Sequence, residues 1–344
     1  MPNKKPKKGI AETAKSFNEE LLAVDRETAI KIIEKYSMLN KRIDVVFNRL
    51  YEQLKRQQRS GAVFNETSIL QTGLYDKLYK AINTELVKVN KSVSVLITRN
   101  QKKSANLAIK SSKAIGKANL QEINSKLKFA TLDKSAINFM SGFLGNGQPI
   151  ESVVQLIPDL IQNEIKDKLA GLTVQTIAKN KAKKDIKNAI GQGLHKSLII
   201  SRSEAMRVFR NVTHQSNLKN GNLGSRWVWV ARYSKSTCAS CIALSGTIHP
   251  ISEEMRSHPR CRCYQLFLAD GVESNIELGV EWLKKQDTKT QKSVIGSNIG
   301  FEAYKSGILE LNDFIGKGNN AVFGDYYYQL SVKKALEQQS TFQK

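Results

Sequence analysis

The stretch "CASCIALSGTIHPISEEMRSHPRCRC", residues 238–263, holds all four cysteines of this 344-residue chain and two of its four histidines. It begins with Cys-x2-Cys, and sixteen residues later continues as His-Pro-Arg-Cys-Arg-Cys. A Cys-x2-Cys turn lets two thiolates share one ion, and a second pair from a distant segment completes a tetrahedron. The pattern predicts a structural metal site, with Zn²⁺ as the expected ion and candidate ligands Cys238, Cys241, His258, Cys261 and Cys263.

Five candidate ligands compete for four positions, so the expected set is the four cysteines, or three of them with His258. Reduced buried thiols and two disulfides are the alternatives to a metal. A catalytic ion is disfavoured because it needs an open position and a placed general base. Glu253 and Glu254 lie between the ligand pairs, but nothing in the sequence fixes them near the ion.

Two short strands are predicted on either side of this stretch. "RWVWVARYS" at 226–234 alternates with period two and is rich in β-forming residues. "RCRCYQLFL" at 260–268 is the second candidate, and a strand there would put Cys261 and Cys263 on one face. Two small strands bury little surface, so we expect a metal ion to supply folding free energy that the small core lacks.

The region upstream is expected to be helical, because no proline lies between Lys7 and Gln148. The segment at 102–121, "KKSANLAIKSSKAIGKANLQ", has small residues and lysines but a poor apolar stripe. We expect it to be a helix that lies shallow on the others or faces a partner. Two other segments have apolar residues at steps of three and four, the period of an amphipathic helix: Ala29, Ile33, Tyr36, Leu39, Ile43, Phe47, Leu50 and Leu54, and then Leu74, Leu78, Ile82, Leu86, Val89, Val93 and Leu96.

A boundary is predicted at "SGFLGNGQPI", residues 141–150, which is dense in glycine and ends near a proline. The predicted fold is mainly α, with a small α+β cysteine/histidine module near residues 200–270. The predicted regions are a long-helix N-terminal region at 1–145, a helical region at 146–220, the β-containing Cys/His module at 221–270 and a helical tail at 271–344.

The net charge of +23 arises entirely upstream of residue 251, and residues 86–121 and 205–252 contain no acidic residue. Such one-sided segments suit a polyanion, of which nucleic acid is the commonest. A solvated helix surface explains them equally well. The predicted nucleic-acid-binding residues are the basic ones of the first segment: Lys88, Lys91, Arg99, Lys102, Lys103, Lys110, Lys113 and Lys117.

Composition and hydropathy indicate a globular chain without a membrane partner. The chain is 40% hydrophobic and 25% charged, and apolar runs such as "VSVLI" at 93–97 are far too short to span a bilayer. No apolar segment follows the charged N-terminus, so no secretory signal is visible. We therefore expect synthesis in a reducing cytoplasm, where clustered cysteines more often hold a metal than form disulfides.

The segment from about 195 to 316 resembles the phage head morphogenesis family of Mu F-like minor head proteins. The similarity includes Arg-[Ser/Thr]-Glu on a helix, a Trp-containing strand, Cys-x2-Cys-x2-Leu-x-Gly and His-Pro-x-Cys-Arg-Cys. Ser245 stands where the family usually has Asp, and residues 234–237 lack its common acidic residue. The matching positions are Arg202, Ser203, Glu204, Trp229, Cys238, Cys241, Leu244, Gly246, His258, Pro259, Cys261, Arg262 and Cys263.

The resemblance implies a minor structural protein of a tailed-phage head, located in the virion and made in the host bacterial cytoplasm. Its implied partners are portal and capsid proteins and packaged double-stranded DNA, with no small-molecule substrate and no enzymatic activity. Arg202 and Glu204 are expected to form a structural ion pair or a helix end that contacts the cysteine module. Trp229 and Gly246 are expected to be structural.

Two other classes of function stay open at this stage. The first is a nucleic-acid-binding zinc protein outside any virion, in which the cysteine module contacts bases or phosphates. The second is a metal-dependent nuclease or a toxin-associated head protein. The sequence contains no recognisable paired carboxylates, Ser/His/Asp set or phosphate-binding glycine loop that would favour an enzyme.

Overall fold

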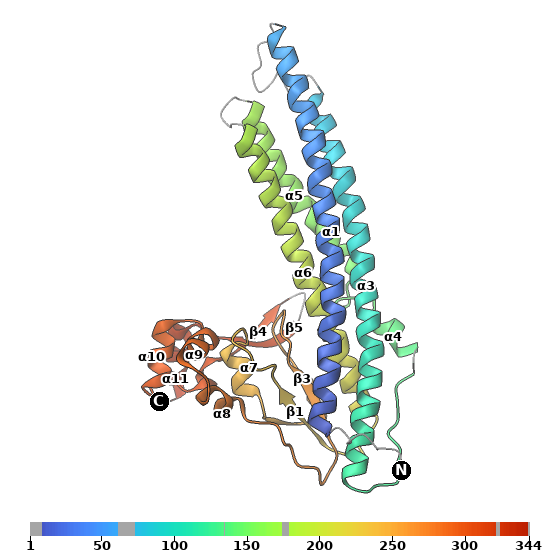
Figure 1. The fold of residues 1–344 in the computed structure, drawn as a ribbon, viewed down its shortest axis with the longest axis vertical. Helices are drawn as coiled ribbons and strands as arrows, with labels where there is room; N and C mark the ends of the chain where they lie inside the picture. Colours follow the sequence, from blue (N-terminus) through green and yellow to red (C-terminus); the bar gives the residue numbers. More distant parts are fainter. Residues whose placement is uncertain (1–8, 61–72, 134, 174–178, 321–323, 343–344) are drawn as a thin grey trace, which may run out of the picture. The chain divides into compact units, whose positions relative to one another are not determined.

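The computed structural model describes residues 9–60, 73–133, 135–173, 179–320 and 324–342. As predicted, the fold is mainly helical with a small α+β region (Figure 1). Among the described residues, no helix combines the length and the apolar character needed to cross a bilayer. The elements are α1 Ile10–Arg59, α3 Leu74–Glu122, α4 Ser135–Met140, α5 Ile150–Thr173, α6 Lys179–Leu218, β1 Arg226–Val230, α7 Ala239–Leu244, β2 Ile248–Pro250, β3 Tyr264–Leu268, α8 Gly279–Lys284, α9 Thr288–Ile295, α10 Asn298–Lys305, the 3₁₀ turn η1 Leu311–Phe314, β4 Ile315–Asn320, β5 Gly324–Gln329 and α11 Val332–Phe342.

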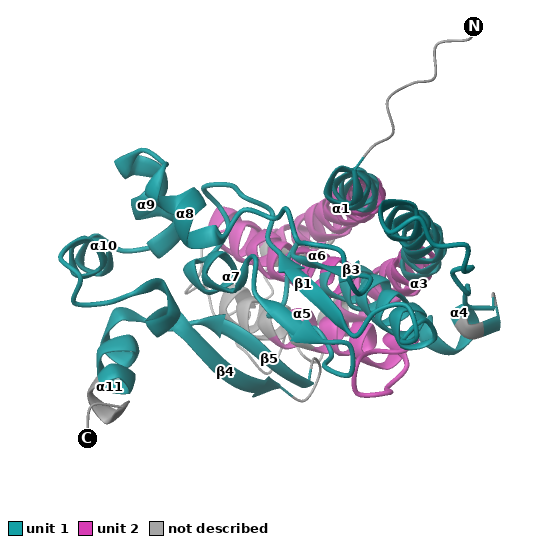
Figure 2. Cartoon of the chain, turned by 90° about the horizontal axis from the view of Figure 1, so that it is seen from below, with its two compact units in different colours: residues 1–23, 101–141, 203–344 teal, residues 24–100, 142–202 magenta. Residues whose placement is uncertain are grey.

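The chain divides into two compact units that do not follow chain order (Figure 2). Unit 1 combines residues 1–23, 101–141 and 203–344, and unit 2 combines residues 24–100 and 142–202. The helices α1, α3 and α6 each contribute to both units. One boundary falls between Ser141 and Gly142, inside the glycine-rich segment singled out in the sequence.

Unit 2 is a bundle of the helices α1, α3, α5 and α6, which run side by side (Figure 1). Tyr36 of α1 forms a buried hydrogen bond with Ser197 of α6, with 2.9 Å between the oxygens. The expected stripe of α1 needs one correction, because Ile32 is fully buried whereas Ile33 is 45% exposed. Consecutive helical residues differ by about 100° in direction, so the stripe through Tyr36 includes Ile32 and leaves Ile33 outside.

In unit 1 one face of the second half of α3 is deeply buried, so the expectation that residues 102–121 lie shallow on the other helices is wrong. Ala105, Ala108 and Ser111 are all at most 3% exposed. A Cβ atom on Gly116 would lie 2.1 Å from Cδ2 of Phe129. Small side chains on α3 allow neighbouring groups such as Phe129 to approach its backbone closely. A helix face packed through small residues has no stripe of large apolar residues that the sequence would show.

The three-stranded sheet of unit 1 is antiparallel with the order β2-β1-β3. Both faces of β1 are buried: Trp227 and Trp229 pack into one core with the cysteines, and Val228 and Val230 pack into another. The second predicted strand exists but begins only at Tyr264. The two last cysteines therefore precede β3, and strand alternation is not what aligns them.

The tail at 271–344 contains the predicted helices but also a β-hairpin that the sequence analysis missed. The strands β4 and β5 pair antiparallel, with Gly316 opposite Tyr328 and Gly318 opposite Tyr326. Glycine weakens a strand and hides the alternation on which strand prediction depends. Here the tyrosine rings lie over the glycines, at about 3 Å from where a Cβ atom would stand on Gly316 or Gly318.

Candidate metal centre

The first ligand pair lies at the start of the helix α7. Cys238 is the N-cap residue, with extended backbone (φ −72°, ψ 156°), and Cys241 lies in the first turn. The N–H of Ile242 donates to the carbonyl of Cys238 over 3.1 Å, which closes this turn. The cap residue and the first turn thereby present both sulfurs to one point, as expected for Cys-x2-Cys.

The second ligand group is shaped by a tight turn formed by His258, Pro259, Arg260 and Cys261. The N–H of Cys261 donates to the carbonyl of His258 over 3.2 Å, and Arg260 has a left-handed backbone with φ of 65°. Proline at the second position and a positive φ at the third are the features of a type II turn. This turn, rather than a strand, brings the side chains of His258 and Cys261 to the same side.

The distances between ligand atoms are close to those of a tetrahedral site. His258 Nε2 lies 3.2 Å from the sulfur of Cys238 and 3.2 Å from that of Cys241, and the sulfurs of Cys241 and Cys261 are 3.6 Å apart. Metal–ligand bonds of about 2.3 Å to sulfur and about 2.0 Å to nitrogen predict edges of roughly 3.5–3.8 Å in a tetrahedron. Cys263 joins Cys241 and Cys261 in a second group of mutually close thiols.

These residues can therefore hold a metal ion, and they form no disulfide. All four cysteines are free, and a disulfide requires sulfurs about 2.05 Å apart. The orientation of the imidazole also fits a metal. His258 Nδ1 lies 2.8 Å from the carbonyl of Pro259 and donates to it, which leaves Nε2 as the ligand atom that faces the thiols.

The charges within the cluster also favour a cation. A hydrogen bond from Cys241 is the main reason why the pKa of the Cys238 thiol falls to about 4, and His258 adds to the effect. Burial alone would lower the pKa of His258, but hydrogen bonds to Cys238 and Cys261 raise it to about 11. Without a metal, these shifts favour a thiolate at Cys238 beside a protonated imidazole at His258, and a bound metal ion would replace the protons that the two groups share.

Two residues of α6 support the ligand loop: Ser203, which matches the family-like Arg-Ser-Glu but had no predicted role, and Arg210, which the sequence did not indicate. Ser203 accepts a hydrogen bond from the N–H of Arg260 over 3.1 Å. Arg210 donates to the carbonyls of Cys261 and Cys263 over 3.0 and 2.7 Å. Ser203 and Arg210 are seven residues apart, so two helical turns put them on one face. The spacing of seven residues from Ser203 of the family-like Arg-Ser-Glu is the one sequence signal that could have indicated Arg210.

The residues predicted as structural each have a defined place. Arg202 pairs with Asp25 in unit 2, with Nε and Oδ2 2.7 Å apart, whereas fully buried Glu204 pairs with Arg207 in unit 1. Arg202 and Glu204 therefore form ion pairs within different units, each with another partner.

Trp229 and Gly246 meet at the junction of β1 and α7. The indole of Trp229 is 1% exposed, in the core that contains the cysteines. The N–H of Gly246 donates to the carbonyl of Trp229 over 2.8 Å, and Gly246 has a φ of 89°. This contact fixes the end of α7, and with it the first ligand pair, against the sheet.

The predicted nucleic-acid-binding residues all lie on α3 with exposed side chains, outside the cysteine cluster. Lys88 pairs with Glu85, with Nζ and Oε1 3.0 Å apart. Lys102, Lys110, Lys113 and Lys117 follow one face of the part of α3 that belongs to unit 1, opposite its buried small residues. The remaining members are Lys91, Arg99 and Lys103.

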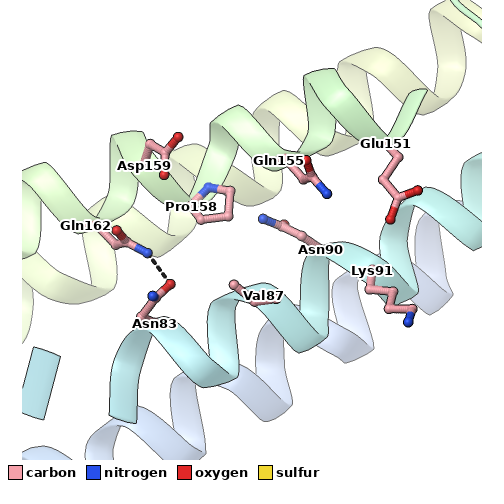
Figure 3. A pocket seen from close by; sticks show the side chains of 9 residues that line it. All are labelled: Asn83, Val87, Asn90, Lys91, Glu151, Gln155, Pro158, Asp159 and Gln162. Atoms are coloured by element: carbon pink, nitrogen blue, oxygen red, sulfur yellow. Dashed lines mark hydrogen bonds between the residues drawn. The ribbon is translucent and has the colours of Figure 1, made fainter. Parts of the chain in front are cut away.

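A polar pocket of about 390 Å³ lies in unit 2 between α3 and α5 (Figure 3). Gln162 donates a hydrogen bond to Asn83 at one end, and Lys91 and Glu151 line the other. Asn90 is 3% exposed and its Nδ2 atom has no partner among the described residues. The lining carries both a cation and carboxylates, so it does not define the charge of a ligand.

Comparison of the chain with protein-family models, with curated proteins and with solved structures returned no match. The functional proposal therefore rests on the geometry of the cysteine cluster, the distribution of charge and the sequence resemblance described above.

Proposed function

We propose that this chain is a non-enzymatic structural protein of a tailed-phage head, in which a Zn²⁺ ion holds the cysteine module together. The close grouping of Cys238, Cys241 and His258, and of Cys241, Cys261 and Cys263, in unit 1 supports the metal centre. The role in a phage head rests on the resemblance of residues 195–316 to the Mu F-like minor head proteins. On this proposal the protein acts in capsid assembly near the portal, with portal and capsid proteins as partners.

The character of the ligand set supports a structural rather than a catalytic ion. Structural zinc sites are closed and rich in thiolates, whereas catalytic sites keep one position for water or substrate. Cys241 and Cys261 are at most 4% exposed, Cys238 and His258 are half-buried, and neither ligand group among the described residues includes a carboxylate. Zn²⁺ fits better than harder cations, because thiolates select soft or borderline ions.

The metal is tested by elemental analysis of the purified chain together with Cys238→Ser and Cys261→Ser. We expect one equivalent of zinc in the unaltered chain, little or none in either variant, and lower thermal stability in both. Ser236→Ala, an exposed change in the same loop, is the control and should keep its zinc. An unaltered chain that is folded and free of metal would refute the metal centre.

The head-protein proposal has its own test, independent of the metal. We expect portal, terminase and capsid genes beside the gene for this chain, and mass spectrometry should detect the chain in purified phage particles. A regulator-type gene context and absence from the particles would instead favour the nucleic-acid-binding zinc protein. Metal-dependent cleavage of DNA by the purified chain would favour the nuclease alternative.

Contact with double-stranded DNA is a second component of the proposal, and one observation favours it. Four lysines of the acid-free segment share one exposed face of α3 in unit 1 over about 22 Å, at 1.5 Å per residue. Such a row can follow a line of phosphates without reading bases. The four are Lys102, Lys110, Lys113 and Lys117.

Salt dependence tests this contact directly. The slope of log affinity against log salt changes by about 0.9 for each phosphate neutralised, so replacing the four lysines by glutamine should weaken binding and flatten the slope by up to about 3.6. A control with the same loss of charge replaces four exposed lysines of the tail and should retain the slope. The control positions are Lys284, Lys285, Lys333 and Lys334. If both variants change the salt dependence of DNA binding equally, a specific role of α3 is excluded.

A further inference from the structure

Arg210 is a buried cation without an acidic partner. Its side chain on α6 is only 7% exposed, and it makes no ion pair with any carboxylate in the described part of the chain. The neighbouring arginines of the helix differ, because Arg202 pairs with Asp25 and Arg207 with Glu204. Burying an uncompensated guanidinium is costly, so a negative group must lie close by.

The guanidinium points at the second half of the cysteine cluster. Its Nε and Nη2 atoms donate to the carbonyl of Cys263 over 3.0 and 2.7 Å, and Nη2 also donates to the carbonyl of Cys261 over 3.0 Å. Carbonyl groups satisfy its hydrogen bonds but carry no net charge. The hydrogen bond to the carbonyl of Cys261 brings the guanidinium near the side chain of that residue, whose sulfur is negatively charged when it is a metal ligand.

The charge balance selects one ligand set. A divalent ion with four thiolates has two net negative charges, whereas three thiolates and a neutral imidazole leave one. We infer that Arg210 is the counter-charge of a centre formed by Cys238, Cys241, His258 and Cys261, and that it positions the loop carrying Cys261. This inference rests on the proposed metal centre and adds to it a ligand set and a supporting residue.

The distances agree with this choice of ligands. Nε2 of His258 lies 3.2 Å from the sulfurs of both Cys238 and Cys241. If His258 were not a ligand, its ring would still contact the two metal-bound thiolates. Cys241 lies 3.6 Å from Cys261 and thereby links the two halves. Cys263 stands beside the four ligands, and its carbonyl is the main acceptor of Arg210.

The test measures Zn²⁺ affinity, by competition with a chromophoric chelator, in three variants of the full-length chain. Arg210→Met removes the charge and keeps much of the volume, and outer-shell changes of this kind typically weaken metal binding by about 10–100-fold. Arg210→Lys keeps the charge but loses the planar fork of donors, so a role through charge predicts an affinity within about threefold of that of the unaltered chain. Arg226→Met is the matched control, because Arg226 also donates to a backbone carbonyl, that of Val272, and it should bind Zn²⁺ normally.

The ligand set is tested with Co²⁺ as a spectroscopic probe. Cys263→Ser should bind Co²⁺ with the charge-transfer intensity of the unaltered chain, corresponding to three thiolates, whereas Cys261→Ser should lose a third or more of it. Equal losses in both variants would overturn the ligand set.

The Zn²⁺ affinities of the unaltered chain and of the Arg210 variants distinguish a failure of this inference from a failure of the proposed metal centre. If the unaltered chain binds Zn²⁺ tightly and folded Arg210→Met binds it equally well, the counter-charge role is wrong and the metal centre stands. If the unaltered chain binds no Zn²⁺, both are wrong. Should Arg210→Met fail to fold, Arg210→Lys decides: an affinity within threefold supports the role of charge, and a loss of tenfold or more overturns it.

Discussion

Two glycines in unit 1 have a left-handed backbone conformation, which glycine adopts more easily than residues with a side chain. Gly246 (φ 89°) follows α7, and Gly307 (φ 76°) follows α10. Any other residue is strained in this left-handed region. The two positions differ in their surroundings, because a Cβ atom on Gly246 would lie 2.7 Å from Cδ2 of Leu278, whereas nothing lies within 4 Å of one on Gly307.

Gly246→Ala should therefore destabilise unit 1 more than Gly307→Ala. The strain of a left-handed alanine is about 1 kcal/mol in both, and the contact with Leu278 should add about 1–2 kcal/mol in the first. Urea unfolding followed by tryptophan fluorescence measures the difference, with Gly307→Ala as the control. Equal losses of stability would show that Leu278 moves aside at no cost.

The phenol of Tyr36 links the stability of unit 2 to alkaline pH. Burial raises its pKa from 10.0 to about 12, and the hydrogen bond with Ser197 only partly opposes this. Between these values the unfolded chain loses the phenolic proton while the folded chain keeps it. Its contribution to stability is therefore complete below about pH 10 and is lost as the pH rises through about 12.

The expected loss is about 2–3 kcal/mol, at 1.36 kcal/mol for each pKa unit. Helix content measured by circular dichroism between pH 9 and 12 gives the comparison. Tyr36→Phe lacks this titration and should show a smaller decrease over the same range. Parallel curves for the two proteins would contradict the linkage.

At the scale of elements, α3 is joined to β3 by one buried amide. Asn119 is 1% exposed; its Nδ2 donates to the carbonyl of Phe267 over 3.1 Å, and its Oδ1 accepts from the N–H of Ala269 over 2.7 Å. It thereby satisfies two backbone groups at the end of the strand that follows the ligand loop. A buried donor or acceptor without a partner costs about 1–3 kcal/mol.

Asn119→Ala should accordingly lower the stability of unit 1 by about 2–4 kcal/mol. Asn106→Ala on the same helix is the control, because Asn106 is exposed and bonds only the carbonyl of Lys102. Its effect should stay within about 0.5 kcal/mol. Thermal unfolding of both variants tests the prediction, and similar melting temperatures would contradict it.

At the scale of the whole molecule, the two compact units should respond differently to removal of the proposed metal. An ion that binds only the folded state adds about 4 kcal/mol when its free concentration is a thousand times its dissociation constant. A chelator should therefore speed amide hydrogen exchange in residues 226–268 of unit 1. Residues 24–58 of unit 2 should exchange at unchanged rates, and a uniform increase across the chain would contradict a local role.

Local chemistry made several features predictable from the sequence. The Cys-x2-Cys and His-Pro-x-Cys-Arg-Cys spacings indicated a shared site because short turns between ligands determine which groups can meet. The long helices followed from an apolar period close to 3.6 residues, and β1 from its alternation. The glycine-rich segment at 141–150 marked a place where the two compact units divide.

Other features depended on contacts between distant parts of the chain, which only the tertiary structure decided. The burial of α3 through small residues, the hairpin β4–β5 and the role of Asn119 all involve partners more than a hundred residues away or glycines covered by rings. Arg210 is the clearest case. The sequence alone indicates surface charge for a basic residue on a helix. Arg210 instead supports the cysteine loop, because folding places two carbonyls that lie 51 and 53 residues downstream within 3.0 Å of its guanidinium.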